Sequence, residues 1–270
     1  MKKVIAYHSD CGLYSTLVGK TIGVIKSLSP QTIVECCNVG FEKDNIPQLS
    51  AYLFTTVPYW PDDSIFVSDM GKGRPIGVKL DNGSVILSYD NGTSTMCVKH
   101  FGFSGACLID DEKYGTDGFA LARAAAALAN GTAFEDLGAS LNKEDVCFLH
   151  MPQAEISEGK AVGEVSMLLK GFGNITFSIG TDEFEKTNIR HGDKVRVTFT
   201  RNGQVEYQEE MTYQPSFGYV GVGEPVIFNG SSGYMDIGLN LRSFINTCIP
   251  QILDVEDPGE FKVVIERIEL

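Results

Sequence analysis

Apolar positions in the first half of the chain alternate between strand-like and helix-like spacing. Short β-branched runs predict strands, and longer segments with an apolar residue every third or fourth position predict helices. The predicted strands are 4–8, 32–38, 64–68, 76–80 and 85–88, and the predicted helices are 13–28, 46–57 and 116–130. An Asp-Asn-Gly turn joins the last two strands as a hairpin. Such alternation is typical of an α/β layer with a mainly parallel sheet.

The pattern changes near residue 155. Residues 151–163 are rich in Pro, Gly and charged residues, which predicts a linker. Short runs of β-type residues separated by turn signals follow at 164–169, 175–179, 195–199, 205–212, 226–228, 235–239 and 262–269. We therefore predict an α/β N-terminal domain over residues 1–155 and an all-β, small-barrel C-terminal domain over residues 156–270.

Composition and charge narrow the classes of partner. The 270 residues carry 22 Lys and Arg against 35 Asp and Glu, a net charge of −13, and contain no basic run. Nucleic acid and anionic membrane surfaces are therefore not expected as partners. No apolar run is long enough to cross a bilayer, and the N-terminus lacks the apolar region of a signal peptide, so the cytoplasm is expected. The seven cysteines form no CxxC and no zinc spacing, so neither a disulfide framework nor a metal is predicted.

Two glycine-containing stretches are similar to nucleotide-binding motifs but do not match their spacing or context. In "GLYSTLVGKT" six residues separate the first glycine from Gly-Lys-Thr, where a phosphate loop needs four, and "GKGRPIG" opens no helix. What remains are polar residues at the ends of predicted strands: Asp10, Asp69, Asp90 and Asn91. Any one of these residues alone is more often a helix cap or a turn former than part of a site. Together at one sheet edge they are candidates for a ligand site.

The stretch "SIFVSDMGKGRPIGV" places Asp69 at the tip of a buried strand and Arg74 across a glycine turn. Arg74 could hold Asp69 ionised as part of a site. The alternative is a surface ion pair that contributes at most about 1 kcal/mol.

Six segments, in order along almost the whole chain, resemble the S-adenosylmethionine hydroxide adenosyltransferases. These enzymes split S-adenosylmethionine with water into adenosine and methionine, and are related to the bacterial fluorinase and chlorinase. The similar segments are "HSDCGLYSTLVGKTIGVIKSLSP", "VSDMGKGRP", "SYDNGTST", "KYGTDGFALARAAAALANG", "GFGNITFSI" and "EPVIFNGSSGYMDIGLN". The resemblance implies an α/β domain followed by a small barrel, no cofactor, and a homotrimer that binds its substrate between subunits.

The same resemblance assigns roles to individual residues. Asp69 and Arg74 occupy the first two places of the hydrolases' water-activating Asp–Arg–His set, and Tyr114 stands where that set has its histidine. The implied substrate-binding residues are Asp10 for the ribose, Asn91 in the third segment, Asn174 and Phe217 for the adenine, and Ser231 and Ser232 for the methionine carboxylate.

Two departures from the family pattern keep three functions open. Tyr114 replaces an imidazole, which is the better base at neutral pH. Leu169 lies where the halogenases have the aspartate that binds the methionine amino group. The chain nevertheless keeps Asp69, which both halogenases replace. The alternatives are a hydrolase of S-adenosylmethionine, a halide-using adenosyltransferase, and a protein that binds an adenosyl compound without turning it over.

Overall fold

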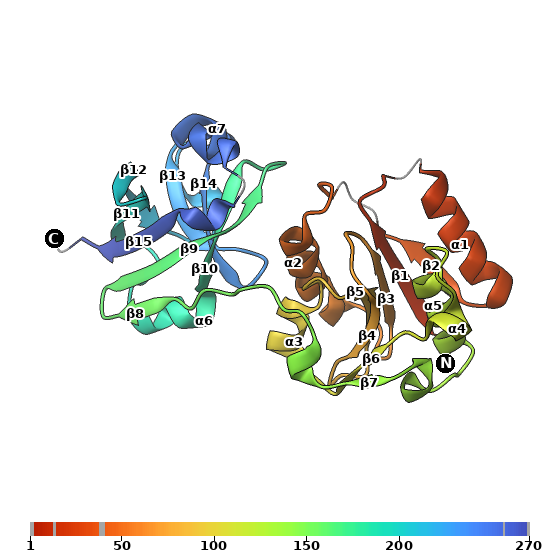
Figure 1. Ribbon diagram of the computed structural model, residues 1–270. Coiled ribbons are helices and arrows are strands. Elements are labelled where there is room, and N and C mark those ends of the chain that lie inside the picture. The colour runs from red at the N-terminus through yellow and green to blue at the C-terminus, as the bar shows by residue number, and fades with distance from the viewer. Residues whose placement is uncertain (1–2, 13–14, 38–40, 256, 269–270) are drawn as a thin grey trace. The chain divides into compact units, whose positions relative to one another are not determined.

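The computed structural model describes residues 3–12, 15–37, 41–255 and 257–268. The chain divides into two compact units, Met1–Leu149 and His150–Leu270. The first is an α/β layer and the second a β barrel (Figure 1). Residues 13, 14, 38 and 269, at the ends of predicted elements, lie outside the described residues. Among those described, no helix has the length and apolarity needed to cross a membrane.

The first unit is built on a seven-stranded sheet in the order β2-β1-β3-β5-β4-β6-β7. Its strands are β1 (Val4–Ser9), β2 (Ile33–Cys36), β3 (Ile65–Asp69), β4 (Pro75–Lys79), β5 (Val85–Tyr89), β6 (Gly105–Leu108) and β7 (Ser140–Leu141). The predicted hairpin is confirmed, because β4 and β5 pair antiparallel across the Asp-Asn-Gly turn.

The prediction of a mainly parallel sheet was wrong, because the sheet is mixed. Strands β2, β1, β3 and β5 are mutually parallel, but β4 is antiparallel to β5 and to β6, and β6 is antiparallel to β7. Strand β4 follows β3 in the sequence but does not pair with it. Strand β5 lies between them, parallel to β3 and antiparallel to β4. A tight hairpin forces antiparallel pairing, whereas parallel neighbours need a long crossover.

Helices cover both faces of this sheet (Figure 1). Helices α1 (Thr16–Leu28) and α5 (Ala120–Ala129) pack on the face that carries Tyr7 and Val67, and α2 (Ile46–Thr56) and α3 (Thr95–Phe101) pack on the opposite face. Ser15 and Asn45 cap α1 and α2 with side-chain oxygens that accept backbone N–H bonds. The shorter helices are α4 (Asp111–Tyr114), η1 (Val57–Tyr59), η2 (Phe134–Leu137) and η3 (Lys143–Asp145).

The second unit is a barrel of seven strands, which the β9–β10 pairing closes, with β8 added beside β9. The strands are β8 (Glu155–Ser157), β9 (Lys160–Leu169), β10 (Asn174–Gly180), β11 (Lys194–Arg201), β12 (Gln204–Tyr213), β13 (Pro225–Asn229), β14 (Tyr234–Leu239) and β15 (Lys262–Arg267). The helices are α6 (Thr181–Phe184), α7 (Phe244–Cys248), η4 (Glu185–Thr187), η5 (Phe217–Tyr219), η6 (Pro250–Asp254) and η7 (Pro258–Glu260). The predicted linker over 151–163 was wrong in part, because β8 and the start of β9 lie within it.

Candidate active site

Asp69 is the last residue of β3, at the edge where parallel strands β1, β3 and β5 end. It lies opposite Ser9 of β1. The Tyr7 hydroxyl donates a hydrogen bond to Asp69 Oδ2 at 3.1 Å, and Tyr89, the last residue of β5, also interacts with the carboxyl group. Alternation along the strands places these three side chains on one face of the sheet. The sequence therefore builds a carboxylate between two phenols at the position where α/β sheets bind ligands.

The surroundings of Asp69 make it a stronger base than an ordinary aspartate. Burial raises the pKa of Asp69, and the charge of Asp10 raises it further, while the hydrogen bonds from Tyr7 and Tyr89 lower it. Burial and the neighbouring Asp69 raise the pKa of Tyr7 as well, so Tyr7 stays protonated as a donor. A carboxylate with an elevated pKa beside a ligand site is a candidate general base.

Asp10 lies at the same edge, one residue beyond the end of β1. Its Oδ2 accepts a hydrogen bond from the backbone N–H of Asp44 at 2.8 Å. The structure thus brings two of the predicted site residues, Asp10 and Asp69, to neighbouring strand ends.

Arg74 does not pair with Asp69, and that prediction was wrong. Arg74 Nε lies 2.9 Å from Asp90 Oδ2, and the side chain is 43% exposed. The register explains the difference, because Pro75 pairs with Tyr89 and the next backbone bond runs from Asp90 N–H to Arg74 O. Strand β5 separates β4 from β3, so the guanidinium meets the residue after β5.

Gly73 allows the turn before Arg74 to approach this strand end closely. It adopts φ 146°, and a methyl group there would lie 3.1 Å from the backbone nitrogen and oxygen of Asp90. A side chain at this position would be strained and would push Arg74 away from Asp90.

Tyr114 lies in the hydrophobic core of the first unit. The residue is 4% exposed at the end of α4, and its hydroxyl has no hydrogen-bond partner among the described residues. Among the described residues this hydroxyl makes no hydrogen bond to Asp69 or Arg74, and the predicted catalytic role of Tyr114 stays a prediction. The backbone carbonyl of Tyr114, unlike its hydroxyl, has a partner: the Arg123 guanidinium donates to Tyr114 O at 2.8 Å.

Replacing Tyr114 by Phe is expected to leave the rate of any reaction at Asp69 within about threefold and to keep or raise the melting temperature. A buried hydroxyl without a partner costs free energy, and Phe keeps the ring. Product formation and thermal unfolding of Tyr114→Phe beside the unchanged protein measure both effects. A loss of activity of 100-fold or more would show that the hydroxyl takes part in the chemistry.

Asn91 is held by its own turn. Its Nδ2 donates to Met70 O at 3.0 Å, and its Oδ1 accepts from the backbone N–H and the hydroxyl of Thr93. These bonds join the loops after β3 and β5. They make Asn91 a residue that shapes the sheet edge, and its predicted contact with a substrate stays a prediction.

In the second unit, the predicted adenine residues lie on one outer face of the barrel. Ile175, Phe177, Met235 and Ile237 fill the interior, so the alternate residues of β10 and β14 face outward. Asn174 is 8% exposed at the start of β10, and a methyl group on Gly238 of β14 would overlap its amide.

A row of paired residues on the same outer face crosses three strands. Thr176 of β10 is paired with Asp236 of β14, which is paired with Phe228 of β13. Phe217 packs edge-on against Phe228 at 5.8 Å between ring centroids, and is 41% exposed. Phe217 therefore has an exposed ring surface near this row, and its predicted stacking on adenine stays a prediction.

The two serines of the β13–β14 turn differ sharply. Ser231 is exposed, whereas Ser232 is 8% exposed and its hydroxyl has no hydrogen-bond partner among the described residues. A buried hydroxyl without a partner needs an explanation, such as a ligand that completes its hydrogen bonds.

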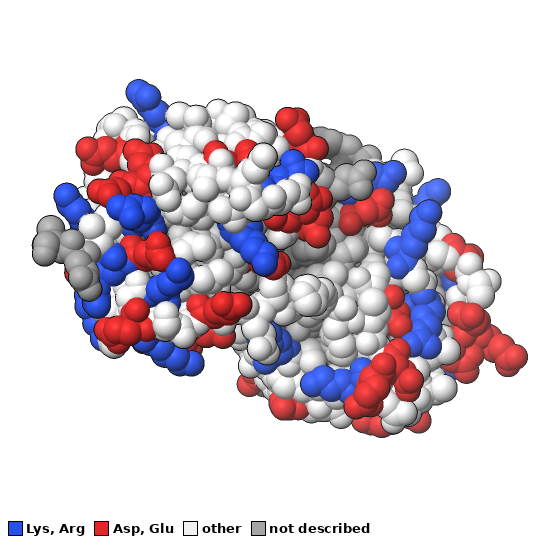
Figure 2. All heavy atoms as spheres, turned by 60° about the vertical axis from the view of Figure 1, so that its left-hand side comes forward, with Lys and Arg blue, Asp and Glu red and all other residues white. Residues whose placement is uncertain are grey.

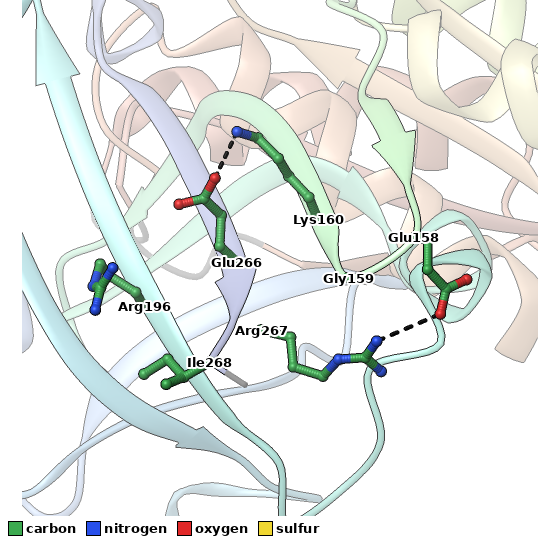
Figure 3. A pocket seen from close by; sticks show the side chains of 7 residues that line it. All are labelled: Glu158, Gly159, Lys160, Arg196, Glu266, Arg267 and Ile268. Carbon is green, nitrogen blue, oxygen red and sulfur yellow. Dashed lines mark hydrogen bonds and ion pairs between the residues drawn. The ribbon is translucent and has the colours of Figure 1, made fainter. Parts of the chain in front are cut away.

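The cavity drawn in Figure 3 is separate from these residues. It has a volume of about 450 Å³ between the β8–β9 turn and β15. Its cations are paired: Lys160 with Glu266 at 2.6 Å, Arg196 with Glu210 at 2.9 Å and Arg267 with Glu158 at 3.5 Å. Basic and acidic side chains are likewise interspersed over the face shown in Figure 2. With its charges already compensated, this cavity is not a candidate for the site.

Three polar residues near the predicted ones were missed by sequence reasoning: Tyr7 and Tyr89 in the first unit, and Asp236 in the second. Tyr7 was predicted only as a strand residue, and Tyr89 lies one residue beyond the predicted strand 85–88. A tyrosine near the end of a buried strand needs a partner for its hydroxyl. Asp236 interrupts the apolar run "YMDIGL" at the position facing out of the barrel. A charge inside such a run was the available signal.

Comparison with known proteins identifies the family. Residues 5–138 match the model of the SAM hydroxide adenosyltransferase N-terminal domain, and residues 169–248 match the model of the C-terminal domain. The chain belongs to this family. Like the two family models, the predicted site residues fall in both units.

Curated relatives of this chain are named fluorinase. The chain is 23% identical to the fluorinase of Actinopolyspora mzabensis, covering 90% of this chain and 92% of that one. It is 22% identical to the fluorinase of Nocardia brasiliensis with the same coverage.

Solved structures share the fold over nearly the whole chain. An uncharacterized conserved protein from Thermotoga maritima has a TM-score of 0.79 at 25% identity, covering 97% of this chain and 100% of that one. A conserved hypothetical protein from Thermus thermophilus has a TM-score of 0.74 at 22% identity, with 98% and 100% coverage.

Proposed function

We propose that the protein is an S-adenosylmethionine hydrolase in which Asp69 activates water for attack at C5′. The observation that carries this proposal is the Asp69 carboxylate, which is held between Tyr7 and Tyr89 at the edge of the sheet and whose pKa is raised by burial. The family supplies the substrate class, an adenosyl sulfonium. The carboxylate supplies the base that hydroxide transfer needs.

The reaction balances with water as the only co-substrate. A water oxygen forms a bond to C5′ while the C5′–S bond breaks and its electron pair returns to sulfur, giving neutral methionine thioether. The proton of the water passes to Asp69 and then to solvent. Because the sulfonium loses its charge in the transition state, a positioned water in a desolvated site contributes more than an anion-binding hole.

A second candidate function is binding of an adenosyl compound without turnover. Arg74 is paired with Asp90, and the Tyr114 hydroxyl has no hydrogen-bond partner among the described residues, so neither side chain is bonded to Asp69. Halide attack is the third outcome, in line with the names of the relatives. The homotrimer with a site between subunits, the absence of a cofactor and the cytoplasmic location stay predictions.

Product analysis separates the three functions. Purified protein incubated with S-adenosylmethionine, with and without chloride, is expected to release adenosine and methionine at a rate that chloride does not change. Chlorinated adenosine would establish a halide-using enzyme. Intact S-adenosylmethionine that nonetheless binds, by calorimetry on the same samples, would establish a binding protein and refute the hydrolase.

A further inference from the structure

Asp236 is a buried carboxylate that the proposed chemistry does not use. It lies in the middle of β14 on the outer face of the barrel and is 4% exposed. The Thr176 hydroxyl donates to Asp236 Oδ1 at 2.6 Å. A methyl group on Gly230, at the start of the β13–β14 turn, would lie 2.6 Å from the Asp236 carboxyl group. Glycine therefore lets the turn close directly over this carboxylate.

The carboxylate has no cationic partner among the described residues. The ion pairs of the barrel that the structure shows lie at its other strands, for example Arg196 with Glu210. Burial raises the pKa of Asp236 to about 6, and the bond from Thr176 only partly opposes the shift. At neutral pH and above the group is still mainly ionised, so the folded protein holds a buried negative charge that one hydroxyl stabilises. Buried charges in proteins are ordinarily paired with an opposite charge.

Ser232 is a second, independent observation at the same turn. Its hydroxyl is buried and lacks a partner, and it lies two residues from Gly230, which covers Asp236. The turn thus presents a hydroxyl that can donate and a carboxylate oxygen, Asp236 Oδ2, that can accept. The charged acceptor, Asp236 Oδ2, suits an ammonium group, and the neutral donor, the Ser232 hydroxyl, suits a carboxylate group. The turn therefore complements a ligand that has both groups.

We propose that Asp236 binds the α-ammonium group of the ligand's amino-acid end, beside Ser232. This inference rests on the proposed function, because it takes an adenosyl amino acid as the ligand. An ammonium group has N–H donors that can reach Oδ2, whereas a sulfonium centre has none. Asp236 is then a specificity-determining residue that separates S-adenosyl amino acids from adenosyl compounds lacking that end.

Calorimetry with three ligands tests the assignment. An Asp69→Asn background slows turnover, and Asp236→Asn is compared with the unchanged Asp236 in that background. The ligands are S-adenosylmethionine, S-adenosylhomocysteine, which keeps the ammonium but has a neutral sulfur, and 5′-methylthioadenosine, which lacks the amino-acid end. We expect Asp236→Asn to weaken the first two by about 10- to 100-fold and the third by less than about threefold.

Asp236→Asn keeps an oxygen for Thr176, so the barrel is expected to stay folded. At pH 8 its melting temperature should equal or exceed that of the parent, because a buried charge is removed. Equal loss for all three ligands would make Asp236 structural and overturn the inference. A loss for S-adenosylmethionine alone would point to the sulfonium and overturn the ammonium assignment.

Two further outcomes separate this inference from the proposed function. Unchanged binding of every ligand to Asp236→Asn would overturn the inference and leave the proposed function standing. Failure of the parent to bind any of the three would overturn the proposed function, and the inference with it.

Discussion

Asp69→Asn is expected to lower the rate of adenosine formation by about 10²- to 10⁴-fold with little change in KM. Asparagine keeps the size of the side chain and can still accept the hydrogen bond from Tyr7, but it cannot take a proton from water. Steady-state kinetics with S-adenosylmethionine measure the effect. Glu210→Gln, which removes an exposed carboxylate paired with Arg196, is the matched control and should keep full activity.

The pH dependence of the unchanged enzyme follows from the same group. The base must be ionised, and its raised pKa moves the acidic limb of the rate profile above the range of an ordinary aspartate. Tyr7→Phe removes a hydrogen bond that lowers this pKa, so the limb should move to higher pH. Full activity in Asp69→Asn, or a limb unmoved in Tyr7→Phe, would contradict the role of Asp69 as base.

Lowering the pH from about 6.5 to about 4 is expected to remove about 3 kcal/mol of stability through His8 alone. His8 is fully buried on β1, among the rings of Phe41, Tyr52 and Phe66, and its Nε2 has no partner among the described residues. Burial lowers the pKa of His8 to about 4. As the pH falls, His8 of the unfolded chain takes up a proton at a higher pH than His8 of the folded protein. The contribution of neutral His8 to stability is therefore complete above the pKa of the unfolded chain, and it is lost as the pH falls through the pKa of the folded protein.

Comparison of His8→Phe with the unchanged protein separates the loss of stability due to His8 from the loss due to carboxyl groups. The carboxyl groups titrate in both proteins. The free energy of unfolding, from denaturant titrations between pH 7.5 and pH 4, should fall less steeply in the variant. His150→Gln, at an exposed position, should keep the slope of the unchanged protein. Parallel curves for His8→Phe would mean that His8 does not titrate as a buried neutral group.

Local patterns predicted the elements better than their arrangement. The Asp-Asn-Gly turn correctly predicted the β4–β5 hairpin, since a two-strand turn is decided by residues next to each other. The insertion of β5 between β3 and β4 depends on contacts between distant segments, and it made the sheet mixed. Residues 105–108 form β6 although they carry no β-branched side chain, because the pairing with β4 decides their conformation.

The candidate site was predictable where a residue's place follows from its own strand. Asp10 and Asp69 come to neighbouring strand ends as expected, because β1 and β3 are parallel and in register there. Arg74 could not be placed from sequence, since its partner depends on which strand lies beside β4. Tyr114 was assigned by similarity of position, and its burial depends on the packing of α4 against the core.

Incubation in ¹⁸O-labelled water tests the central claim most directly. If Asp69 activates water for attack at C5′, adenosine formed from S-adenosylmethionine carries one ¹⁸O at its 5′ oxygen, and methionine carries none. Labelled adenosine should form at the rate of total product formation, and this rate should fall in Asp69→Asn. Adenosine without label, a halogenated nucleoside, or no product from a protein that binds S-adenosylmethionine would contradict the account.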